Sequence, residues 1–130
     1  MNNIQILQDS IITSVNMKLF TSIEKASHVH IFNSKLEKFP ISKCNEELLN
    51  FDPQRLQKTA VKAYPLDNRP RGDIDIKSVK FYQKKLKNNN EIDPIWIIKK
   101  NNNYILLDGV HRIVASYIEN KKYILANIIY

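Results

Sequence analysis

The sequence predicts an α+β domain in which helices are intermixed with the strands of a small mixed sheet. Segments with the apolar spacing of amphipathic helices alternate with short runs rich in Ile and aromatic residues. The chain has 130 residues, of which 43% are apolar and 25% charged, as in ordinary globular domains. We therefore expect a single domain over residues 1–130, with an N-terminal extension at 1–38 and the core at 39–130.

The N-terminal third predicts a weak helix and two short strands. Residues 1–26 carry helically spaced apolar side chains, and His28–Phe32 alternates like a strand, with His28 and His30 on one face. Two histidines at this spacing can ligate a metal, but no third ligand is close in sequence, so we expect no metal site. Residues 39–41 predict another short strand.

Two helices separated by a loop are predicted for the middle of the chain. Asp52 and Pro53 form an N-cap and first-turn pair that opens a helix through about Ala63. Residues 64–73 contain two prolines and a glycine and predict a loop, after which Asp75 caps the next helix. The apolar residues of that helix share one face, with lysines on the other: Ile76, Val79, Tyr82 and Leu86.

The C-terminal third predicts a hairpin, a helix and a closing strand. The segments 94–99 and 104–107 are rich in β-forming residues, and the Asn run 101–103 between them favours a turn. The expected helix spans 111–119, and the last strand spans 123–129.

Charge and cysteine content limit the classes of partner. The net charge is +7, and residues 66–130 contribute +5 of it, which indicates an anionic partner such as a nucleotide or a nucleic acid. The single cysteine, Cys44, excludes a disulfide framework, and no Cys or His spacing is that of a zinc site. The chain has neither a long apolar run nor a secretory signal, so we expect a cytoplasmic protein without a membrane partner.

The most informative stretch is the junction between the strand ending at Asp108 and the helix that follows. The first amides of a helix have no partner within it and carry partial positive charge, which suits an anion. Gly109 allows close approach to the backbone, while His111 and Arg112 add donors. Two interpretations stay open: a phosphate site, or a purely structural turn in which Asp108 caps the helix and Arg112 pairs with a local carboxylate.

This stretch resembles the ParB/sulfiredoxin-like superfamily, in which a Gly-x-[His/Arg]-Arg turn precedes an Ala and opens a helix that holds nucleotide phosphates. Gly109-Val110-His111-Arg112 matches the turn, and Ala115 matches the alanine. Residues 93–95 and 124–128 resemble two of the family's strands, and the likeness covers about residues 39–130. The resemblance implies that the turn, Gly109 to Arg112, binds ATP or another nucleotide together with Mg²⁺.

Two upstream segments compete for the family's first box. The segment 68–75, with Arg69 and Arg71, resembles an Arg- and Pro-containing loop that would also face the nucleotide. The segments 40–42 and 51–56 resemble the form of this region found in sulfiredoxins and free-serine kinases. We favour the first register, because its helix leads directly into the strand at 94–99.

The resemblance implies a small phosphotransferase, either a kinase or an ATPase, in which a carboxylate takes a proton from the acceptor. The second register would place Glu46 or Glu47 near the catalytic carboxylate of the kinase-type members. Sulfiredoxins carry their catalytic cysteine where this chain has Val110, so we expect no sulfiredoxin activity. The alternatives are a DNA-binding or nuclease-like domain and a non-catalytic nucleotide-dependent regulatory module. The candidate bases are Asp108, Glu46, Glu47, Asp73 and Asp75.

Overall fold

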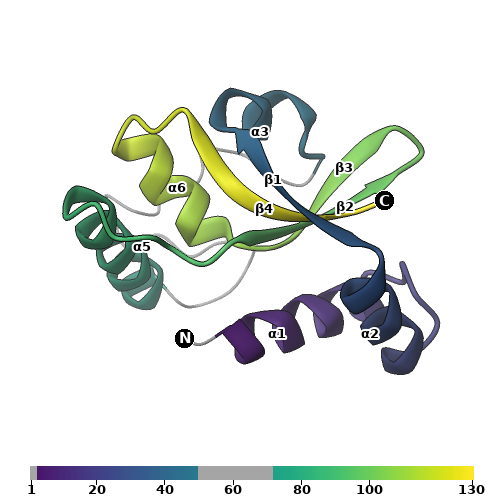
Figure 1. The fold of residues 1–130 in the computed structure, drawn as a ribbon. Coiled ribbons are helices and arrows are strands. Elements are labelled where there is room, and N and C mark those ends of the chain that lie inside the picture. Colours follow the sequence, from purple (N-terminus) through teal and green to yellow (C-terminus); the bar gives the residue numbers. More distant parts are fainter. Residues whose placement is uncertain (1–2, 50–71) are drawn as a thin grey trace.

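The computed structural model, which describes residues 3–49 and 72–130, confirms an α+β architecture around a four-stranded open sheet (Figure 1). The strand order is β1-β4-β2-β3; β2 and β4 run parallel, and the two outer pairs are antiparallel. The strands are β1 (Ser34–Pro40), β2 (Ile95–Lys100), β3 (Asn103–Asp108) and β4 (Tyr123–Ile129).

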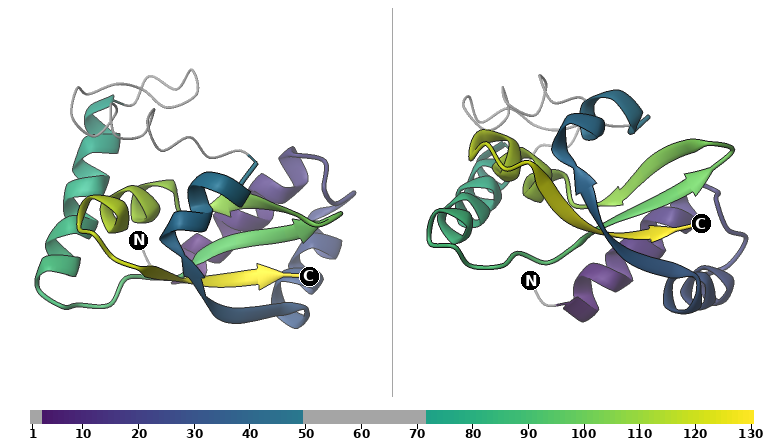
Figure 2. Two further views of the ribbon diagram at one scale, coloured as in Figure 1. Left: turned by 90° about the horizontal axis from the view of Figure 1, so that it is seen from above. Right: turned by 45° about the horizontal axis from the view of Figure 1, so that its top comes forward.

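Five helices in the described residues flank this sheet on both sides. They are α1 (Asn3–Asn16), α2 (Ile23–Phe32), α3 (Ile41–Glu47), α5 (Gly72–Lys87) and α6 (Val110–Ile118). Helices α1 and α2 pack together below the sheet in Figure 1, whereas α5 and α6 pack together on the opposite side (Figures 1 and 2). None of the helices in the described part is both long and apolar enough to cross a membrane.

Strand β2 shows why the sheet needs cover on both faces. Ile95 and Ile97 belong to the core under α5 and α6, while Trp96 and Ile98 belong to the core under α1 and α2. Successive side chains of a strand point to opposite faces, so a strand that is apolar throughout is stable only between two layers. The β3–α6 turn packs against this buried strand, because Gly109 lies against Ile95.

Several predicted elements are confirmed. The predicted hairpin is formed by β2 and β3, and Asn101 and Asn102 occupy its turn with φ of 54° and 66°, the left-handed values that asparagine tolerates. The closing strand β4 has the predicted bounds. The predicted helix at 52–63 lies outside the described residues.

The strand predicted at residues 28–32 is wrong, because these residues form the second half of α2. Ser22 caps the helix by accepting a hydrogen bond from the Lys25 amide at 3.2 Å. His28 packs on Phe32, one turn later, with ring centroids 4.7 Å apart. Five residues are too few to separate a strand period from a helical one.

Other predicted boundaries also move. The strand predicted at 39–41 is the end of β1, which begins at Ser34, and Ile41 starts α3. The helix predicted over residues 1–26 is divided between α1 and the start of α2, and α5 begins at Gly72, before Asp75.

His30 is fully buried between α1, α2 and the sheet. Its Nδ1 lies 2.8 Å from the carbonyl oxygen of Ala26, so Nδ1 carries the proton, and Nε2 accepts from the Ser10 hydroxyl at 3.0 Å. The imidazole ring also packs on Trp96, with centroids 5.0 Å apart. Burial lowers the pKa of His30, partly opposed by its hydrogen bond to Ala26, so the neutral form is favoured in the fold.

We predict that His30 makes the fold less stable in mild acid. Below the unfolded-state pKa of 6.5 the unfolded chain binds a proton that the folded chain resists, so the free energy of unfolding falls as the pH drops. Urea denaturation between about pH 8 and about pH 5 should show this fall in the native protein. His30→Gln, which cannot titrate, should show a smaller fall over that range. Equal pH dependence of the two proteins would contradict the prediction.

Candidate functional site at the β3–α6 turn

Gly109 makes the junction between β3 and α6 possible. Its φ is 126°, a left-handed conformation that side-chain-bearing residues rarely adopt. An added Cβ would lie 2.6 Å from the Cβ of Ile95, closer than real Cβ atoms approach, and 3.2 Å from its backbone Cα, which is also a tight contact. Only glycine therefore lets this turn pack directly against β2.

Arg112, in the first turn of α6, points into the protein and is only 3% exposed. Its Nη1 donates to the carbonyl oxygens of Asp93, at 3.0 Å, and Pro94, and its Nη2 donates to Oδ2 of Asp108 at 3.1 Å. The guanidinium thus joins the segment before β2, the end of β3 and the helix itself. This is the structural role that the sequence left open for Arg112, and its fork is occupied by protein acceptors.

The structural interpretation of the turn expected Asp108 to cap α6, and this expectation is wrong. The N-cap residue is Gly109, and no side chain makes a capping hydrogen bond there. The Asp108 carboxylate is bound to Arg112, and the first turn of α6 contains no acidic residue. The positive end of this helix is therefore left without a side-chain cap or a neutralising carboxylate of its own.

The Asp108 carboxylate is 26% exposed beside this helix terminus. Burial raises its pKa, the positive charge of Arg112 opposes the rise, and the negative charge of Asp9 on α1 adds to it. His111, which is half-buried, lowers the pKa of Asp108 slightly. Asp108 is thus a partly accessible carboxylate with a raised affinity for a proton.

Helix α5 adds a tyrosine to the same cluster. Burial raises the pKa of the Tyr82 hydroxyl, the charge of Arg112 lowers it, and the charges of Asp93 and Asp108 raise it further. Sequence reasoning placed Tyr82 on the apolar face of its helix and did not single out Asp9 or Asp93. No local signal marks these three residues, because the packing of α1 on β3 and of α5 on α6 brings Asp9 and Tyr82 to the site.

The remaining predicted site residues are spread more widely. Val110 is partly buried and packs against the core. Glu46 is exposed on α3, and Glu47 pairs with Lys43 at 3.8 Å. The chain next to α3 bridges to Tyr104 at the start of β3, about 13 Å of strand away from the turn.

The structure thus does not bring Glu46 or Glu47 to the turn. Arg69 and Arg71 lie outside the described residues, and Asp73 and Asp75 fall in the first turns of α5.

Neither a metal cluster nor a reactive thiol accompanies the turn within the described residues. That part of the chain holds no group of three or more His, Cys, Asp or Glu side chains that could bind a metal. Mg²⁺, however, is commonly held by one or two carboxylates together with substrate phosphates, and Asp9, whose charge acts on Asp108, can supply one of them. Cys44 is 1% exposed, and burial raises its pKa to about 12, so the thiol stays protonated and inert.

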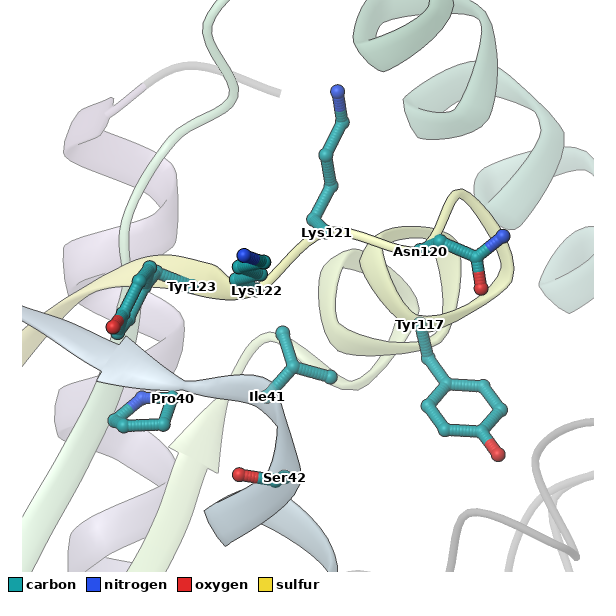
Figure 3. Close-up of a pocket in the computed structure, with 8 residues that line it drawn as sticks. All are labelled: Pro40, Ile41, Ser42, Tyr117, Asn120, Lys121, Lys122 and Tyr123. Carbon is teal, nitrogen blue, oxygen red and sulfur yellow. The ribbon is translucent and has the colours of Figure 1, made fainter.

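A cavity of about 470 Å³ opens at the other end of α6 (Figure 3). Figure 3 shows Ile41 between the neighbouring residues of the chain and Tyr117 of α6, while the Lys121 side chain extends away from the other lining residues. The residue of α6 that lines this cavity is Tyr117, near the C-terminus of the helix. The cavity is therefore separate from the turn at the N-terminus of α6. It is lined by Pro40, Ile41, Ser42, Tyr117, Asn120, Lys121, Lys122 and Tyr123.

Comparison with known proteins adds no assignment. No protein-family model matches the chain, and neither a curated protein nor a solved structure matches it. The interpretation of the turn therefore depends on its own geometry and chemistry.

We predict that Arg112→Ala destabilises the protein even without a ligand. The substitution removes three hydrogen bonds and leaves Asp108 without its partner, which costs about 3 kcal/mol for a largely buried pair. Arg112→Lys should recover only part of this, because one ammonium cannot reproduce the planar fork. Urea denaturation of both variants measures the loss. An unchanged free energy of unfolding in Arg112→Ala would mean that the guanidinium does not hold the turn together.

Proposed function

We propose that this domain has a ParB/sulfiredoxin-like fold and binds the phosphate groups of a nucleotide at the β3–α6 turn. The observation that carries the proposal is the N-terminus of α6, where the N-cap residue is Gly109 and no side chain makes a capping hydrogen bond. Amides at a helix N-terminus and the helix dipole together form a suitable anion site. Gly109 adds a backbone surface without a side chain.

In this proposal Arg112 is a positioning residue and does not contact the ligand. Its buried fork fixes the turn through Asp93, Pro94 and Asp108, so that the amides hold their direction before a ligand binds. Phosphate contacts then come from the first-turn backbone and from the side chain of His111. Binding to a preformed site avoids the entropy loss of ordering a loop.

The reaction class that fits this turn best is phosphoryl transfer from ATP. Asp108 is partly exposed and has a raised pKa, which suits a base that takes a proton from an acceptor hydroxyl. Mg²⁺ bound by the phosphates together with Asp9 would neutralise charge on the transferred group, while Asp108 takes the proton. The two acidic residues of α3, Glu46 and Glu47, have no part in this proposal, because they lie away from the turn.

A thermal-shift titration with ATP, CTP and GTP, each with and without Mg²⁺, tests the proposal. A nucleotide at about 100 times its dissociation constant should stabilise the protein by roughly 2.7 kcal/mol, a melting shift on the order of 5–15 °C. His111→Glu should abolish this shift, because a carboxylate in the first turn repels phosphate. The same carboxylate interacts favourably with the helix dipole, so the ligand-free melting temperature should stay equal or rise.

His111→Gln is the matched control, since it keeps a neutral polar side chain of similar length to glutamate. It should retain a measurable part of the nucleotide shift. The proposal fails if no nucleotide shifts the native protein, or if His111→Glu and His111→Gln respond alike.

A further inference from the structure

Helix α5 presents a face of lysines to solvent. Lys77, Lys80, Lys84 and Lys87 are all exposed and fall within a sector of about 80° around the helix axis. These four residues are called the lysine face below. Val79, Tyr82 and Leu86 project from the other side of α5 into the core. The apolar side thus anchors the helix and leaves the lysine face outward.

A groove of about 460 Å³ runs along this face. Beside it, the side-chain amide of Gln83 donates to Glu119, at the end of α6, at 3.1 Å. Segments 77–91 and 117–123 together contain seven lysines but only two carboxylates, Glu91 and Glu119. The hydrogen bond from Gln83 occupies one oxygen of Glu119. The surface is therefore strongly positive. The groove is lined by Lys80, Gln83, Lys84, Lys87 and Asn88.

We propose that the lysine face binds the phosphodiester backbone of a nucleic acid. From Lys77 to Lys87 the helix rises about 15 Å. One strand of a duplex carries a phosphate per about 3.4 Å of axis, so the same length presents about four phosphates to four lysines. Lysine lacks the planar fork of arginine and contacts phosphates as a point charge. Binding through these lysines therefore does not depend on base sequence.

The chemistry of the face favours a nucleic acid over a lipid surface. A helix that lies in a membrane interface needs an exposed apolar side, and that side of α5 is already in the core. The exposed large apolar residue on the described part of α5 is Phe81, and the Lys85 ammonium lies 5.0 Å from the centre of its ring. This surface is also separate from the proposed nucleotide site, since Gln83 contacts the C-terminal end of α6 and the turn lies at its N-terminal end.

Fluorescence anisotropy with labelled 30-base-pair DNA and with single-stranded DNA and RNA of equal length tests the proposal. The variant Lys80→Ala/Lys84→Ala/Lys87→Ala should bind at least about tenfold more weakly than the native protein at low salt. For duplex DNA, the slope of log binding constant against log salt concentration should become shallower by about 2.7, as expected when three phosphate contacts are lost. The matched control, Lys25→Ala/Lys38→Ala/Lys100→Ala, removes the same charge from exposed sites elsewhere and should bind within about threefold of native.

Three outcomes would overturn the proposal: no binding by the native protein at about 0.05 M salt, equal losses in the two triple variants, or tighter binding to phosphatidylserine vesicles than to any nucleic acid. Which probe binds best distinguishes duplex from single strand and DNA from RNA. The α5 variant should keep the nucleotide-induced melting shift of the native protein. This measurement therefore separates failure of the lysine face from failure of the proposed nucleotide site, and it also checks that the variant folds.

Discussion

The buried guanidinium of Arg112 is the constraint on which the β3–α6 region depends. Three separate segments meet at it: the residues before β2, the end of β3 and the first turn of α6. A buried charge is costly unless it is paired and hydrogen-bonded, so the three segments that supply acceptors to Arg112 depend on one another for their positions. Gly109 completes the arrangement, because only its missing side chain allows the turn to lie against Ile95.

This arrangement links structure to the proposed chemistry. The N-cap residue of α6 is Gly109 and the Asp108 carboxylate is bound to Arg112, so no side-chain hydrogen bond caps the positive end of this helix, where the proposed phosphate site lies. The two apolar layers around the sheet keep Asp108 partly desolvated, which raises its pKa and makes it a better base. The lysine face lies on a different helix surface, so a polyanion could bind there without competing for the turn.

The elements near the site were predictable from sequence because their signals are local. Apolar strands, an asparagine turn and the Asp-Gly junction marked β2, β3, α6 and β4. The direction of Arg112 was not predictable: a fork at a helix start can face a ligand or the core, and only the position of the Asp93 and Pro94 carbonyls decides. The packing of α1 on β3 brings Asp9 close enough for its charge to act on Asp108, and no sequence motif predicts this packing. The alternation of side chains in His28–Phe32 led to a wrong strand prediction, because a pattern of only five residues also fits a helix.

The most direct measurement is an ATP titration with Mg²⁺, followed by ¹⁵N–¹H correlation spectra of the labelled protein with assigned amides. Amides that donate to a phosphate change their chemical shifts most, because hydrogen bonding and charge act on the N–H itself. The account predicts the largest changes at Val110, His111 and Arg112. Largest changes at residues 120–123, beside the cavity at the other end of α6, with the turn unaffected, would contradict it.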